Sequence, residues 1–154
     1  MSFGAGHRAS ERRTDKLHAL LCTPFPENGH IYGVCSYGQL RCLNAETGER
    51  LWETLKPTGA TGERGGQYDR WCNAFIVKGV NHFFFSTEKG DLIIADVVPK
   101  EYHEFSRAHI LDPTSRVMNR EVVWSHPAFA NRSIYARNDK EIVCVSLAAP
   151  GSGK

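Results

Sequence analysis

The sequence predicts an all-β protein of about three four-stranded antiparallel sheets, and three observations carry this prediction. A pattern of apolar run, short polar turn and second apolar run occurs three times, at a spacing of about fifty residues. Proline, glycine and charged residues separate the apolar runs. No stretch longer than about ten residues keeps the period of 3.6 that an amphipathic helix requires. We therefore expect the fold to be built from strands and turns.

The three repeated segments are predicted to be β-hairpins. Residues 31–44 and 83–96 align without a gap, and Gly38 and Gly90 occupy the same turn position in both. A third copy, residues 134–146, is one residue shorter and lacks the turn glycine. Glycine readily adopts the positive φ that short hairpin turns need, and the apolar residues on both sides suit pleated strands.

Short apolar segments beside each hairpin supply the remaining strands. Those upstream are residues 17–22, 73–77 and 124–129, and those downstream of the first two hairpins are 50–54 and 102–110. The chain thus carries two sets of four strands and a third set of three. Four-stranded antiparallel units at this period are typical of the blades of a β-propeller, and a closed ring usually needs about 4–8 of them.

Length and composition are consistent with one folded domain of about three blades. The chain has 154 residues, of which 41% are hydrophobic and 23% charged, which excludes a low-complexity or disordered central region. The predicted propeller-blade domain covers residues 17–149. Its blades are expected at about 17–55, 71–111 and 123–149, with a flexible tail at 150–154.

The N-terminal segment, residues 1–16, is predicted to be a disordered basic tail. It holds four basic and two acidic residues, so its charge is +2, which is the formal net charge of the whole chain. The rest of the chain is neutral, so we expect no nucleic-acid partner. No apolar run is long enough to span a membrane, and none follows the basic residues as in a signal peptide.

A motif of higher specificity follows the first hairpin, in residues 42–52, which read CLNAETGERLW. It resembles the tryptophan-docking motif of quinoprotein-like propellers, Ala-x-Asp-x-x-Thr-Gly-x-x-x-Trp, although Cys42 replaces Ala and Asn44 replaces Asp. The resemblance implies that Thr47 and Gly48 form the turn between the third and fourth strands. It also implies that Trp52 packs between neighbouring blades, where we expect it to be largely buried.

The motif is degenerate in the second repeat and is not reached in the third. Asp96 is kept, but residues 99–102 replace the Thr-Gly turn, and Phe105 is expected to stand in for the tryptophan. Over residues 17–149 the chain is similar to the C-terminal blades of the pyrroloquinoline-quinone-binding-like propeller repeat proteins of planctomycete-type bacteria. Members of this family are usually exported to the periplasm or cell envelope, so the absence of a signal peptide leaves the compartment open.

The resemblance implies a fold and leaves the chemistry open. Many members of the superfamily bind no quinone and act as scaffolds, whereas a quinone dehydrogenase needs pyrroloquinoline quinone (PQQ), calcium and, in the alcohol dehydrogenases, adjacent cysteines. The five cysteines are nowhere adjacent, are odd in number and lack zinc-site spacing, so we expect buried free thiols and no metal site. We expect no cofactor; PQQ with calcium applies only to the oxidoreductase alternative.

The working surface is predicted at the loops on one side of the blades. The hairpin tips at Tyr37, Lys89 and Asp139 should emerge there, together with the long connections 56–70 and 106–122. A ligand-binding cluster within about 10 Å, or two strand spacings, is expected there. Its members are Tyr68, Arg70, His126, Arg137 and Asp139.

Each of these positions also has a purely structural interpretation. His126 can be satisfied by neighbouring backbone, and Arg137 and Asp139 can form a local ion pair in a turn. No arrangement of nucleophile and base indicates catalysis. The sequence thus favours a non-catalytic module for protein interaction or ligand binding, completed by a longer parent chain, by another protein or by self-association into a ring, with a dimer ahead of a trimer. A fragment of a quinone-dependent oxidoreductase and a degenerate fragment without function of its own are the alternatives.

Overall fold

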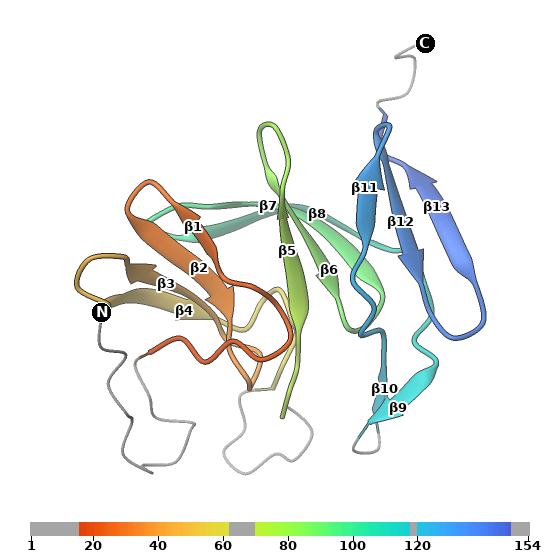
Figure 1. Ribbon diagram of the computed structural model, residues 1–154, viewed down its shortest axis with the longest axis horizontal. Coiled ribbons are helices and arrows are strands. Elements are labelled where there is room, and N and C mark those ends of the chain that lie inside the picture. Colours follow the sequence, from red (N-terminus) through yellow and green to blue (C-terminus); the bar gives the residue numbers. More distant parts are fainter. Residues whose placement is uncertain (1–15, 62–69, 118–119, 149–154) are drawn as a thin grey trace.

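The computed structural model describes residues 16–61, 70–117 and 120–148, and within these ranges it contains thirteen strands and no helix. All strand pairs are antiparallel, and eleven of the strands form three blades that lie side by side (Figure 1). The predicted all-β architecture is confirmed. The predicted tails 1–16 and 150–154 lie outside the described residues, except for Lys16.

The first blade has the order β1-β2-β3-β4, in which three strands confirm the prediction and one corrects it. The innermost strand is not residues 17–22 but β1. It pairs with β2 across Asn28 and Gly29, whose φ angles of 47° and 76° are those of the tight turn favoured in two-residue hairpins. The four strands are β1 (Phe25–Glu27), β2 (His30–Val34), β3 (Leu40–Asn44) and β4 (Arg50–Thr54).

The second blade follows the predicted strands closely, and the third keeps the predicted hairpin, but its first strand lies at 128–130 and not at 124–129. The second has the order β5-β6-β7-β8, with β5 (Ala74–Lys78), β6 (Phe83–Thr87), β7 (Asp91–Val97) and β8 (Tyr102–His109). The third has three strands, β11 (Ala128–Ala130), β12 (Ser133–Arg137) and β13 (Ile142–Ser146). Between these blades the predicted long loop contains a small hairpin that the sequence did not indicate, β9 (Ser115–Val117) and β10 (Arg120–Val122).

Aromatic side chains fill the interface between the first and second blades. The ring of Phe83 packs edge-on against Phe25 at a centroid distance of 5.3 Å and lies 6.2 Å from the ring of Tyr32. This interface belongs to the largest buried apolar cluster of the described residues, which includes fourteen side chains. The contact between the second and third blades has a smaller cluster of its own and includes the ring pair of Phe84 with Phe129 at 5.1 Å.

Trp52 joins the first blade to the second, as the docking motif implies. Its indole Nε1 donates a hydrogen bond of 3.0 Å to the carbonyl oxygen of Val98, just after β7, and its ring packs on the main apolar cluster. The side chain is partly buried rather than largely buried. The motif therefore combines a polar tie between blades with apolar packing.

We expect Trp52→Ala to lower the free energy of unfolding by about 2–3 kcal/mol, because it removes a partly buried ring and one hydrogen bond. Trp52→Phe, which keeps an aromatic ring without the donor, should cost about 1 kcal/mol. Urea denaturation of both variants measures the difference. A loss below about 1 kcal/mol for the alanine variant would contradict the docking role.

Phe105 does not replace this tryptophan in the second blade. A β-bulge occurs at the same repeat position in both blades, after Cys42 and after Ile94. Trp52 lies opposite Cys42, and the residue opposite Ile94 is Ser106. Phe105 falls on the bulge, is 52% exposed and packs between two histidine rings of its own blade, at 4.8 and 4.7 Å.

The face of the first blade that points away from the second blade carries a covering segment, residues 16–22. Leu17 packs directly over Gly33, where an added Cβ would lie 2.8 Å from the leucine side chain. The carbonyl oxygen of His18 accepts a hydrogen bond of 3.0 Å from the backbone N–H of Ser36, and that of Lys16 accepts one from the Arg41 guanidinium. This terminal face is therefore partly occupied by the chain itself.

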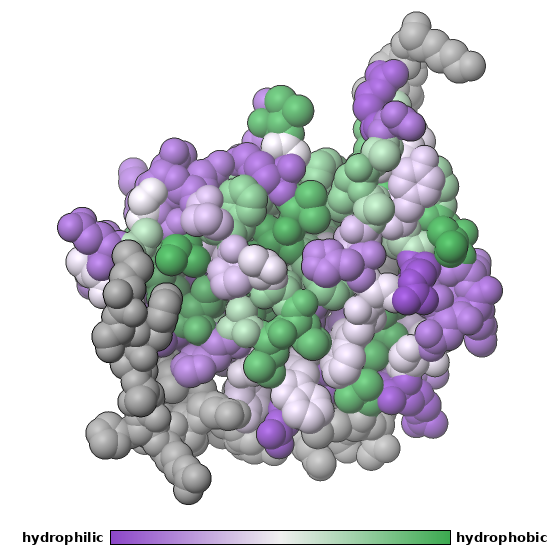
Figure 2. Space-filling model, viewed as in Figure 1, coloured by the Kyte–Doolittle hydropathy of each residue, from purple (hydrophilic) through white to green (hydrophobic). Residues whose placement is uncertain are grey.

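Four of the five cysteines are buried free thiols, as predicted, and Cys144 is exposed. Cys144 lies on β13, where alternate side chains point toward the second blade or away from it. It belongs to the outward set, which nothing among the described residues covers, and this position explains the difference. In Figure 2 apolar surface reaches the side of the third blade where β13 lies.

Candidate functional site

The turns between the second and third strands of each blade lie at the same end of the molecule as the described parts of the connections between blades, the lower end in Figure 1. In the first blade the backbone N–H of Trp71 donates to the carbonyl oxygen of Ser36 at 2.5 Å. In the second, the N–H of Val123 donates to that of Glu88 at 2.7 Å. The two donors are 52 residues apart in the sequence, and so are the two acceptors. The repeat therefore extends into the loops.

A buried carboxylate organises the loops of the second blade. Glu88 is 1% exposed, and it accepts hydrogen bonds from Arg120 Nε at 2.8 Å and from Trp124 Nε1 at 2.9 Å. Arg120 Nη2 also donates to the carbonyl oxygen of Arg70 at 2.8 Å. We call Glu88, Arg120 and Trp124 the Glu88 cluster. It fixes the connection between the second and third blades to the turn after β6.

Two buried donors near this cluster lack an acceptor among the described residues, namely Arg120 Nη1 and Asn73 Nδ2. The backbone carbonyl of Asn73 accepts the N–H of Glu88 at 3.0 Å, so both donors belong to residues bonded to Glu88. Buried donors of this kind are usually satisfied by an ordered water or another acceptor oxygen. An ordered water or another acceptor oxygen at each position would satisfy these two donors.

Two predicted site residues flank the Glu88 cluster. The guanidinium carbon of Arg70 lies 4.8 Å from the ring centroid of Trp71, a residue whose φ of 65° is rare for a bulky side chain. The exposed ring of His126 lies against the buried ring of Phe75, with centroids 4.1 Å apart. His126 thus has a ring partner on β5, and Tyr68 lies outside the described residues.

The other two predicted site residues, Arg137 and Asp139, lie at the turn between β12 and β13. Asp139 Oδ2 accepts a hydrogen bond from Ser115 Oγ at 2.5 Å, and its backbone N–H donates to Thr114 Oγ1 at 3.1 Å. Within the described ranges Asp139 pairs with Ser115, and the alternative ion pair with Arg137 is not formed. The buried Asn138 between them donates from Nδ2 to the carbonyl of residue 112 at 2.9 Å.

The structure thus arranges the four described site residues in two groups, joined by the β9–β10 hairpin. One group lies at the Glu88 cluster and the other at the tip of the third blade, and Ser115 and Arg120 contact them from the two strands of the hairpin. Sequence reasoning missed Glu88 and Arg120. The local sequence Thr-Glu-Lys-Gly has the composition of an exposed turn, and no local pattern indicates that a distant segment covers it.

His109, the last residue of β8, links the second blade to the segment that leads to the third blade. Its Nε2 donates to Asp112 Oδ1 at 2.9 Å and its Nδ1 to Asp91 Oδ1 at 3.0 Å, so both ring nitrogens act as donors when the ring is protonated. These hydrogen bonds, with Asp112 first and Asp91 second, raise the pKa of His109 above its usual 6.5. Asp91 is also paired with Arg107, at 3.1 Å.

The raised pKa of His109 predicts a pH-dependent stability. Because the pKa is higher in the folded than in the unfolded chain, the contribution is complete below about pH 6.5 and is lost as the pH rises through the folded pKa. We expect the difference in unfolding free energy between the wild type and His109→Gln to shrink over that range. Thermal melts at a series of pH values measure it, and a difference that grows with pH would contradict the assignment.

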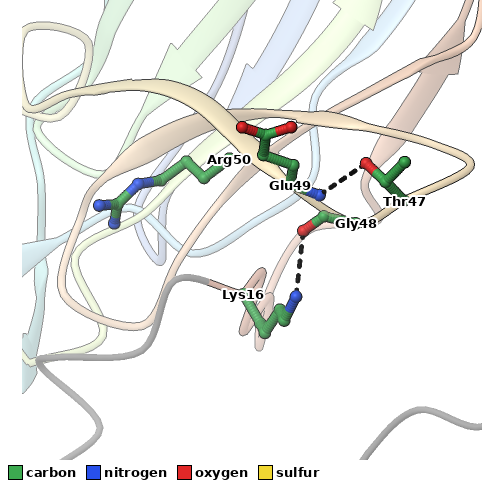
Figure 3. A pocket seen from close by; sticks show the side chains of 5 residues that line it. All are labelled: Lys16, Thr47, Gly48, Glu49 and Arg50. Atoms are coloured by element: carbon green, nitrogen blue, oxygen red, sulfur yellow. Dashed lines mark hydrogen bonds between the residues drawn. The ribbon is translucent and has the colours of Figure 1, made fainter.

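A polar cavity of about 350 Å³ lies at the opposite end of the first blade, beside the docking motif (Figure 3). The motif forms the predicted turn, because Asn44 Oδ1 accepts the backbone N–H groups of residues 46 and 47 at 2.9 Å and Gly48 has a φ of 70°. Lys16 Nζ donates to the Gly48 carbonyl at 3.3 Å. Figure 3 shows the charged groups of Glu49 and Arg50 pointing away from Lys16, so no charged groups converge in this cavity.

Two further observations apply to residues 16–61, 70–117 and 120–148. No group of three or more histidine, cysteine, aspartate or glutamate side chains is arranged to hold a metal ion there. No helix in these ranges has the length and apolar character needed to cross a membrane.

No protein-family model and no curated protein sequence matches the chain. Among solved structures, it is similar to BamB from Moraxella catarrhalis, with a TM-score of 0.50 and 16% identity over 80% of this chain. It is also similar to the quinohemoprotein alcohol dehydrogenase from Comamonas testosteroni, with a TM-score of 0.51 and 14% identity over 79% of this chain. The matches span 30% and 17% of those structures. The similarities show the fold, a partial β-propeller.

Proposed function

We propose that this chain is a non-catalytic β-propeller module that binds another protein through its third blade, where self-association or a longer parent chain completes the partial propeller. The observation that carries the proposal is the amphipathic character of that blade. Ile134 and Ala136 are buried on the side of the second blade, whereas Tyr135 and Ile142 are exposed on the other side, Ile142 to 73%. Large apolar side chains exposed on the free side of a sheet whose other side is buried are typical of an interaction surface.

The loops around the Glu88 cluster support a binding role for this scaffold. They are fixed by buried hydrogen bonds, and they present Arg70, Trp71 and His126 at one end of the blades. Aromatic and arginine side chains on a rigid frame are enriched where proteins bind one another. We infer that these loops form the rim of the interaction surface and that the third blade forms its apolar centre.

The alternative function, a fragment of a quinone-dependent oxidoreductase, is favoured by the similarity to the quinohemoprotein alcohol dehydrogenase. Titration of the purified chain with PQQ and calcium separates the two. We expect no saturable change in quinone absorbance or in tryptophan fluorescence, with a PQQ-binding dehydrogenase as the positive control. Stoichiometric quinone binding would overturn the non-catalytic proposal.

A further inference from the structure

We infer that the protein that the third blade binds is a second copy of this chain, which adds its β13 antiparallel to β13 so that two three-stranded sheets become one six-stranded sheet. The inference rests on the proposed function, because it takes the third blade as the interaction surface. It specifies the partner, the strand and the register.

The backbone of β13 has unused hydrogen-bonding groups along its outer edge. At one end of the β12–β13 ladder the N–H of Leu147 donates to the carbonyl of Arg132 at 2.8 Å, and at the other that of Asn138 donates to Glu141 at 3.1 Å. Hydrogen-bonded and non-hydrogen-bonded pairs alternate between them. The odd-numbered residues of β13 therefore bond to β12, whereas Ile142, Cys144 and Ser146 direct N–H and C=O outward, where no strand among the described residues pairs with them.

The sequence of β13 lacks the features by which edge strands avoid pairing. The strand reads Ile-Val-Cys-Val-Ser, with no charge and no proline, and its ladder with β12 has no bulge. Such a regular, uncharged and β-branched edge is a template for another strand. Since no charged residue lies on β13, pairing of two copies brings no like charges opposite one another.

The register of the pairing follows from the outward groups. When Cys144 lies opposite the partner's Cys144, Ile142 lies opposite the partner's Ser146, and all three outward residues of each strand find partners in about six hydrogen bonds. A shift by two residues in either direction leaves part of β13 unpaired. Tyr135 lies beside Cys144 on the same face. The centred register therefore builds an uncharged row of two tyrosines and two cysteines across the new sheet.

The covering segment of the first blade favours this two-fold arrangement over a head-to-tail ring. A ring of identical chains needs both terminal faces, the outward face of the first blade and that of the third. Residues 16–22 occupy part of the first of these, with Leu17 on Gly33 and the Lys16 carbonyl bonded to Arg41. A two-fold dimer uses the same surface of both copies, and the outer edge of β13 supplies that surface.

Sedimentation velocity from about 1 to 200 µM tests the pairing, and we expect the mass to rise toward twice 17.2 kDa. Cys144→Pro removes the central outward N–H without removing a bond of the β12–β13 ladder. It should raise the dissociation constant at least about tenfold, because each copy loses a hydrogen bond at the dimer axis. Cys144→Ser keeps the N–H and is the matched control, which should remain dimeric.

Hydrogen exchange followed by NMR on the wild type provides a second readout that needs no variant. The amide of Cys144 should become protected as the concentration rises, whereas the amide of Val143, which bonds to β12, should be protected at every concentration. Protection of both amides in the dilute chain would overturn the inference.

The outcomes separate the inference from the proposed function. A wild-type chain that stays monomeric through about 200 µM, or a dimer that Cys144→Pro does not weaken, overturns the β13 pairing. Neither result concerns the quinone titration, so a monomer that binds no PQQ leaves the non-catalytic proposal standing. Quinone binding overturns that proposal whatever the mass of the chain.

Discussion

Gly90→Ala is expected to lower the free energy of unfolding by about 3–5 kcal/mol, one of the two largest effects foreseen for a single substitution. Gly90 has a φ of 83°, and an added Cβ would lie 1.6 Å from the carbonyl oxygen of Leu111. The neighbouring backbone is itself held, because the N–H groups of Ile110 and Leu111 both donate to the Gly90 carbonyl. Relief of the clash therefore requires the loss of these bonds.

Gly29→Ala is the matched control, and chemical denaturation of both variants measures the contrast. Gly29 has a similar φ of 76°, but no heavy atom lies within 4 Å of the position of an added Cβ. Only the backbone conformation is then penalised, at about 1 kcal/mol. Equal losses for the two variants would show that the close approach to Leu111 contributes nothing.

Glu88→Ala is expected to cost about 3–5 kcal/mol, because removal of one partner leaves the other side of a buried ion pair uncompensated. Arg120 Nε and Trp124 Nε1 would both lose their acceptor. Both residues belong to the connection between the second and third blades, so this connection would lose its anchor to the turn after β6. The melting temperature should fall sharply, and the fluorescence of Trp124 should report the loosened connection.

Two variants define how much of this effect comes from burial. Glu88→Gln keeps an acceptor oxygen for the tryptophan and should cost about half as much as the alanine variant. Glu27→Ala removes a carboxylate from a partly exposed pair with Lys78, at 3.0 Å, and should cost less than about 1 kcal/mol. If Glu27→Ala and Glu88→Ala are equally destabilising, the argument from burial is wrong.

The sequence was most informative where a structural feature depends on neighbouring residues. The repeated hairpins could be predicted because alternating apolar residues and a turn glycine are local properties, and the position of Gly90 shows the limit. Its positive φ was foreseen from the hairpin turn, whereas the approach of Leu111 depends on a connection that folds back over the turn. The innermost strand of the first blade could also be recognised locally, because the adjacent Asn28 and Gly29 are a strong hairpin signal. Two prolines, Pro24 and Pro26, and the leucine-rich residues 17–22 obscured this signal.

The site depends on contacts between distant residues and was therefore harder to predict. Arg70 was singled out and lies at the Glu88 cluster, but its link to the cluster is its backbone carbonyl. Glu88 and Arg120 are 32 residues apart, and neither has neighbours that indicate burial. Glu88 is a buried structural residue only because the β9–β10 hairpin places the guanidinium of Arg120 over the turn after β6.

Ser106, at the position equivalent to Trp52, determines where the molecule is weakest. The second blade has no docking tryptophan on its fourth strand. The third blade is joined to it by the Trp124–Glu88 hydrogen bond, two ring pairs and a buried cluster of three side chains, against fourteen in the cluster shared by the first two blades. The first two blades should therefore behave as one cooperative unit and the third as a separate, less stable one. Under a pulling force or in mild denaturant the chain should lose its blades in order from the third, and amide hydrogens of β12 should exchange through partial opening while those of β6 await global unfolding.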